Sequence, residues 1–169
     1  MRIRLLLAIY ALLLLILQAC FRIETYPPEP QISLKYFTLN DTTDALGNPG
    51  LKGEMCISFI DGDGDIGYNE PADTSLIDSM KTVFIKQYYK VNGIFVESQQ
   101  QVDYSYRVPF FSTEPNNPSL KGDIIIHDLN SYGPFEGDTI KYTVYIRDRA
   151  GNRSNTAETE ELVLINYVN

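Results

Sequence analysis

The chain has 169 residues, with 14 Lys and Arg against 22 Asp and Glu, so its net charge is −8 at neutral pH. An acidic chain without a cluster of Lys or Arg is a poor candidate for binding nucleic acid or anionic lipid headgroups. The single histidine, His127, excludes a multi-histidine metal site. No nucleophile elbow, glycine-rich phosphate loop or paired-cysteine metal motif occurs in the sequence. We therefore expect no enzymatic activity, with a carboxylate-pair hydrolase as a weaker alternative, since two acids need only meet in space.

The first 19 residues have the pattern of a signal peptide. Arg2 and Arg4 precede the apolar run LLLAIYALLLLIL, which is shorter than the roughly 20 residues of a membrane-spanning helix. The run ends in Leu-Gln-Ala-Cys at residues 17–20, which resembles the bacterial lipobox. This resemblance implies that Cys20 becomes the first residue of the mature protein and carries diacylglycerol and a fatty acyl chain such as palmitate. Removing residues 1–19 takes away two basic residues and no acidic ones, so the net charge becomes −10.

The segment after the lipobox is expected to be a tether. Residues 20–31 include Pro27, Pro28 and Pro30, and proline keeps the backbone extended and prevents helix formation. The other cysteine, Cys56, would have no disulfide partner if Cys20 is lipidated. It stands between apolar neighbours in EMCISFI, so we expect it to be a small buried hydrophobic residue.

Residues 32–169 are expected to form one domain made of strands. Segments rich in β-branched and aromatic residues alternate with Gly-, Pro- and Asn-rich turns. The expected strands are 32–39, 52–60, 81–91, 94–98, 102–111, 121–129, 139–148 and 158–166. Asn92-Gly93 predicts a tight type I′ hairpin, and residues 73–80 allow a single helical turn. About eight short strands without long helices predict an all-β fold, an antiparallel β-sandwich.

The last third of the chain carries a resemblance. The stretch GDTIKYTVYIRDRAGNRSNTAETEELVL resembles the closing strands of fibronectin type III and other immunoglobulin-like modules. The resemblance implies that Tyr142 is the corner tyrosine of such a fold. It also implies that Asp148, Gly151 and Asn152 build the turn between the last strands. A fold of this kind says nothing about activity.

The order of lipobox, proline-rich tether, DGDGDIG and DRAGNRSN resembles that of uncharacterised lipoproteins of Bacteroidota-type bacteria. The resemblance implies an extracytoplasmic protein held at the outer membrane by its N-terminal lipid. Lipoproteins exported to the cell surface in that group often carry an acidic run directly after the cysteine. Here that place is taken by FRIETY, so the periplasmic face and the surface face both remain open.

The stretch FIDGDGDIGYNEPAD, residues 59–73, predicts a metal site. Asp61, Asp63 and Asp65 alternate with glycine, and linear calcium loops place acids at their first, third and fifth positions. In the same register the carbonyl of Gly67 is seventh and Asn69 is ninth. Like charges about 6 Å apart repel by roughly 3 kcal/mol at an effective dielectric constant of 20. A bound calcium ion would relieve this repulsion.

The match to a helix-flanked calcium loop is incomplete. Ile66 occupies the sixth position, where glycine is expected, and Ala72 occupies the twelfth, where glutamate is expected. Glu70 or Asp73 would have to supply the missing carboxylate from a loop of another shape. The alternative to a metal site is a solvated loop in which Asp-Gly pairs form tight turns. If calcium is bound, we expect it to stiffen the loop rather than to drive a reaction.

The function expected from these features is that of a non-enzymatic binding or envelope-assembly component, with a protein or a glycan of the envelope as its partner. The alternative is a carbohydrate-binding module for glycan capture. The sequence contains 12 tyrosines and eight phenylalanines, and QYY, YSY and PFF are candidates for a sugar-stacking or partner-binding surface. Strand alternation places about half of such residues in the core, and tryptophan is absent.

Overall fold

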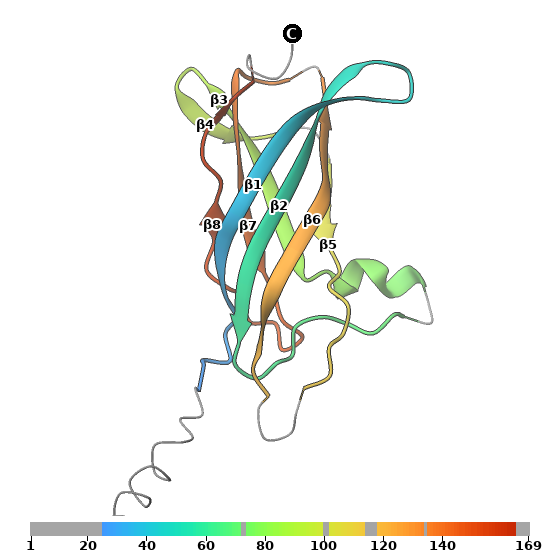
Figure 1. Ribbon diagram of the computed structural model, residues 1–169, viewed down its shortest axis with the longest axis vertical. Helices are drawn as coiled ribbons and strands as arrows, with labels where there is room; N and C mark the ends of the chain where they lie inside the picture. Colours follow the sequence, from blue (N-terminus) through green and yellow to red (C-terminus); the bar gives the residue numbers. More distant parts are fainter. Residues whose placement is uncertain (1–24, 72–73, 100–101, 114–117, 134, 165–169) are drawn as a thin grey trace, which may run out of the picture.

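A computed structural model describes residues 25–71, 74–99, 102–113, 118–133 and 135–164. This part of the chain contains nine strands and one short 3₁₀ helix, η1 (Thr74–Met80). The strands form two antiparallel sheets that face each other, which confirms the predicted all-β sandwich (Figure 1). No helix among the described residues is long and apolar enough to cross a membrane. The predicted signal peptide, Cys20 and Asp73 lie outside the described residues.

The smaller sheet has three long strands in the order β1-β2-β6. Their bounds are Gln31–Thr43 for β1, Pro49–Asp61 for β2 and Leu120–Tyr132 for β6. The middle strand, β2, pairs along nearly its whole length with both neighbours. Its side chains are therefore the most completely buried of the three, and Cys56 is among them as a free, buried thiol.

The larger sheet has β3 and β7 at its centre, paired from Val83↔Ile146 to Tyr89↔Ile140. Two short strands share each edge: β4 and β5 both pair with β3, and β8 and β9 both pair with β7. The larger sheet thus has four strand positions, and the sandwich has seven. The bounds are Val83–Val91 for β3, Ile94–Glu97 for β4, Tyr104–Tyr106 for β5, Thr139–Ile146 for β7, Ala157–Glu158 for β8 and Leu162–Val163 for β9.

Strict alternation along the central strands builds the core. In β7, residues 140, 142, 144 and 146 are buried, whereas 141, 143 and 145 are partly exposed, as a period of two requires. These side chains meet those of β2 and β3 in one cluster. Burial of apolar surface at about 25 cal/mol per Å² is the main stabilising contribution of such a cluster.

The core also contains a polar network that joins the two sheets. The Gln87 amide in β3 donates to the Tyr142 hydroxyl at 3.0 Å and to the Ser131 hydroxyl of β6 at 3.4 Å. The Tyr89 hydroxyl lies 3.4 Å from the same Ser131 oxygen. Burial raises the pKa of Tyr142 and keeps it neutral. Tyr142, which the resemblance implied to be a corner tyrosine, therefore uses its hydroxyl to accept a hydrogen bond from a side chain of the neighbouring strand β3.

The structure confirms the predicted hairpin, places the seven-residue 3₁₀ helix η1 where a single helical turn was expected, and corrects two strands. Asn92 and Gly93 both have positive φ, 51° and 82°, between β3 and β4, as a type I′ turn requires. The strand expected over 102–111 is limited to β5, because Tyr68 donates its amide to the Val108 carbonyl and draws residues 107–109 away from the sheet.

The strand expected over 158–166 is broken into β8 and β9 as far as the described residues extend. Thr159 causes the break: its hydroxyl accepts the amide of Tyr142 at 3.0 Å and donates to the carbonyl of Glu160. A side-chain oxygen thus replaces a backbone carbonyl in the ladder, and regular pairing resumes only at Leu162.

Candidate metal site

Two segments far apart in sequence meet at one end of the sandwich. The acidic loop follows β2, and the turn after β7 lies against it (Figure 1). The amide of Arg149 donates to the carbonyl of Asp65 at 3.4 Å, and the Arg149 guanidinium donates to the carbonyl of Gly67 at 2.7 Å. The described chain also begins at this end (Figure 1).

The acidic loop is fixed by one apolar anchor and by its glycines. Ile66 is fully buried in the core cluster, which explains an isoleucine where a calcium loop would have glycine. Its amide donates to Asp61 Oδ2 at 3.1 Å. Gly64 and Gly67 have φ of 68° and 85°, a region that favours glycine. These constraints turn the loop back over the end of β2 and bring its aspartates together.

The turn after β7 contributes a fourth aspartate. Asp148 is 1% exposed, and its carboxylate accepts the amide of Asn152 at 2.7 Å and the Asn152 side-chain amide at 2.8 Å. Gly151 has φ of 92° and donates to the Asp148 carbonyl. The three residues implied by the resemblance thus do build this turn, and Asp148 faces the acidic loop as well.

The four aspartates form a cluster that could hold a metal ion. Asp61, Asp63, Asp65 and Asp148 each offer a carboxylate oxygen, and these oxygens all lie within 4.8 Å of one another. Calcium binds oxygen at about 2.3–2.6 Å, so ligands on opposite sides of one ion lie roughly 5 Å apart. The cluster is therefore compact enough to surround a single ion.

Two of these carboxylates are held in a way that leaves one oxygen free. Asp61 Oδ2 is bonded by the Ile66 amide and Asp65 Oδ2 by the Ala150 amide at 2.9 Å. Among the described residues, Asp61 Oδ1 and Asp65 Oδ1 are buried and have no hydrogen-bond partner, and Asp61 is completely inaccessible to solvent. Leaving a buried charged oxygen unpaired is costly, so the arrangement favours a ligand that supplies positive charge.

The electrostatic setting reflects the same cost. Burial raises the pKa of the Asp61 carboxyl from 3.8 to about 7, and the charge of Asp63 adds to the increase. Burial also raises the pKa of Asp65, with contributions from Asp148 and Asp63. Without a cation, Asp61 therefore keeps its proton to a much higher pH than an ordinary aspartate does.

The structure brings together some of the residues that the sequence predicted as metal ligands, but not all of them. Asp61, Asp63 and Asp65 do come together, and Asp148 joins them from 83 residues beyond Asp65. The carbonyl of Gly67 accepts a hydrogen bond from Arg149, and Asn69 is exposed. The roles of Gly67, Asn69 and Asp73 as ion ligands remain predictions.

The segment expected to be a tether touches the acidic loop at its described end. The carbonyl of Pro27 accepts the amide of Gly62 at 3.1 Å. A side chain at Gly62 would collide with this backbone, since its Cβ would lie 2.3 Å from the carbonyl oxygens of Tyr26 and Pro27. The Tyr26 ring also lies 4.1 Å from the Lys121 ammonium, measured to the ring centroid. Residues 26 and 27 thus pack on the domain over the first turn of the loop.

Replacing Gly64 by alanine should disrupt this loop. The new Cβ would lie 1.8 Å from the Pro118 carbonyl oxygen, at a positive φ, so the backbone must move. We expect Gly64→Ala to lower the free energy of unfolding in urea by at least about 2 kcal/mol. Gly93→Ala is the matched control, because Gly93 also has a positive φ but has open space around it. Equal losses in the two variants would show that the close approach of the 118 segment is unimportant.

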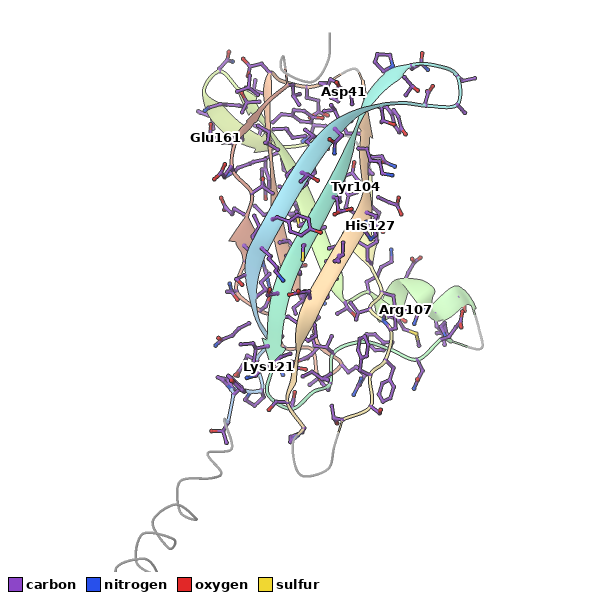
Figure 2. The ribbon with its side chains drawn as sticks, viewed as in Figure 1. Asp41, Tyr104, Arg107, Lys121, His127 and Glu161 are labelled. Carbon is purple, nitrogen blue, oxygen red and sulfur yellow. The ribbon has the colours of Figure 1, made fainter. Side chains whose placement is uncertain are left out.

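A second concave region lies along β6. It encloses about 560 Å³ and has mainly apolar walls, including Phe59, Val108 and Ile126. Two of its polar side chains are engaged elsewhere: Arg107 donates to the carbonyl of Tyr68, and His127 lies 2.7 Å from Glu54. Figure 2 shows Arg107 and His127 at this side of the sandwich. His127 is thus hydrogen-bonded, and it is exposed and lies within β6.

Comparison of the chain with protein-family models, with curated proteins and with solved structures found no match. Fold and site alone therefore define its class: an antiparallel β-sandwich with a cluster of four aspartates at one end that could hold a metal ion.

Proposed function

We propose that this chain is an extracytoplasmic lipoprotein whose β-sandwich is a non-enzymatic binding or assembly component of the cell envelope. Its acidic cluster holds a structural calcium ion. The observation that carries the calcium site is the buried, unpartnered Oδ1 of Asp61 beside three other aspartates. An all-oxygen ligand set of high negative charge suits a hard cation, and calcium accepts the irregular geometry of such a loop better than magnesium does.

The calcium ion has a mechanical role in this proposal. It would join the loop after β2 to the turn after β7 through Asp65 and Asp148, and the described end of the tether packs on that same loop. With Cys20 in the outer membrane, this end of the sandwich faces the bilayer. Calcium therefore stiffens the part of the domain that bears on the anchor.

We further propose that the sandwich is an immunoglobulin-like or fibronectin type III-like domain. Three strand positions in one sheet and four in the other, with the turn built by Asp148, Gly151 and Asn152, support it. The alternative function, a carbohydrate-binding module, is supported by cationic and aromatic side chains on the outward face of the larger sheet.

Lipid attachment is tested by the mass of the processed protein. We expect the protein from bacterial membranes to begin at Cys20 and to carry diacylglycerol and a fatty acid. Cys20→Ser should abolish both modification and membrane retention, because stable anchoring needs two or more acyl chains. Cys56→Ser is the control, since this buried thiol lies inside the domain, and it should leave the lipid in place. A processed N-terminus without fatty acid would refute the anchor.

A further inference from the structure

We propose that Arg147 and Arg153, on the outward face of the larger sheet, bind the carboxylates of an acidic glycan. This inference deepens the proposed binding role and rests on it, but it does not involve the calcium site or the lipid.

The outward face of the larger sheet carries an unusual concentration of cations for an acidic protein. This face points away from the smaller sheet (Figure 1). Three of its lysines are each neutralised by a glutamate within 3.0 Å. The pairs are Lys86–Glu97, Lys90–Glu161 and Lys141–Glu158. The chain therefore places acids opposite cations here wherever the cation is a lysine.

The two arginines of the same face differ from these lysines in their surroundings. Arg147 and Arg153 lie directly opposite each other in an isolated antiparallel bridge, where Cα atoms are about 4.5–5.5 Å apart. Both side chains are exposed, and among the described residues no acid pairs with either. Like charges directly opposite each other destabilise a β-ladder. In a chain with 22 acids, this unrelieved repulsion indicates that negative charge arrives from outside.

The arginines are also held in place for recognition. Phe84 and Tyr145 stack at 5.0 Å with an interplanar angle of 11°. The Arg147 guanidinium lies 5.3 Å from the Phe84 ring centroid, and that of Arg153 lies 3.8 Å from the Tyr145 centroid. A guanidinium resting on a ring keeps its in-plane N–H groups available. Within the described part of the chain, one of these N–H groups is used, by Arg153, which donates to the Thr156 hydroxyl at 3.3 Å.

The chemistry of the surrounding surface selects the ligand. Paired guanidinium groups match carboxylate, sulfate or phosphate oxygens in a bidentate manner. A nucleic acid or an anionic bilayer presents dense charge over a wide area, which the acidic remainder of the protein repels. A stable interface with a protein partner needs an apolar centre that is exposed before binding. The two rings beside the arginines, Phe84 and Tyr145, are not among the exposed large hydrophobic residues. A narrow, hydroxyl-rich polymer with spaced carboxylates fits the site best.

The inference is tested with the full chain as purified from cells, by calorimetric titration with hyaluronan oligosaccharides, which carry glucuronate. The same oligosaccharides with their carboxylates reduced to hydroxymethyl groups serve as the neutral ligand. We expect binding of the acidic form only, weakened by added salt. Arg147→Gln and Arg153→Gln should each lower the affinity about tenfold or more, because each removes charge-assisted hydrogen bonds. Arg147→Lys should lose most of the same affinity, since lysine lacks the bidentate fork.

Lys86→Gln is the matched control, because it removes one positive charge from the same sheet face but from a residue paired with Glu97. Its affinity should stay within about twofold of the parent value, given that exposed ion pairs contribute little. The inference is overturned if the acidic oligosaccharide does not bind, if the reduced form binds equally well, or if Lys86→Gln weakens binding as much as the arginine variants. Equal binding of oligo-glutamate would overturn the assignment to a glycan.

Discussion

Calcium at about 1 mM should raise the free energy of unfolding of the metal-free protein by about 2.7 kcal/mol, if the site has a dissociation constant of about 10 µM. For a domain of this size the melting temperature should rise by roughly 5–11 °C. The reason is that the proposed ion would bind only where Asp61, Asp65 and Asp148 are brought together, and the unfolded chain does not assemble them. Differential scanning calorimetry with chelator and with added calcium measures the effect.

Asp61→Asn separates this effect from general salt stabilisation. The variant removes a buried carboxyl whose Oδ1 has no hydrogen-bond partner among the described residues. Above pH 7, where Asp61 carries a charge, it should therefore melt higher than the parent in chelator, and it should show no response to calcium. Asp41→Asn is the control, because Asp41 is an exposed acid at the opposite end of the sandwich (Figure 2). It should keep the full calcium shift. A calcium shift of the same size in Asp61→Asn would show that the stabilisation arises elsewhere.

The metal-free protein should lose stability as the pH rises from about 4 to about 7. The folded-state pKa of Asp61 is raised from 3.8 to about 7, so between these values the folded protein keeps a proton that the unfolded chain releases. The resulting stabilisation is complete below pH 3.8 and is lost as the pH passes 7. Three pKa units correspond to at most about 4 kcal/mol. The raised pKa of Asp65 acts in the same direction.

Urea unfolding at several pH values, in chelator, tests this prediction. The decline should be much smaller in Asp61→Asn, which has no carboxyl at this position to titrate. With calcium present the dependence should reverse, because the ion binds the deprotonated carboxylates and is displaced by protons. Parallel pH profiles of the parent and Asp61→Asn would contradict the assignment of the titrating group.

Local patterns predicted most of the fold. Alternation in β7 and the Asn92-Gly93 turn each depend on residues adjacent in sequence, so both could be predicted from sequence and both were confirmed. The shortened β5 could not be predicted, because its cause is a bond from Tyr68, which is 40 residues from Val108. The break at Thr159 likewise depends on a hydroxyl that replaces a carbonyl across the sheet.

Only part of the candidate site could be predicted from the sequence. The spacing of Asp61, Asp63 and Asp65 marks the loop, but Asp148 joins it only through the pairing of distant strands. The DRAGNR motif contained the signal, since an aspartate that fixes a turn has a defined orientation, yet nothing local indicates what it faces. The arginine pair was missed for the same reason: Arg147 and Arg153 become neighbours only when the turn between them closes.

The most direct test of the calcium site is a crystal structure of the protein grown with millimolar calcium. One ion should lie about 2.3–2.6 Å from Asp61 Oδ1 and Asp65 Oδ1, with Asp63 and Asp148 among its other ligands. Anomalous scattering would identify it. Density for water alone between these carboxylates, with Asp61 Oδ1 still without a cation, would contradict the site.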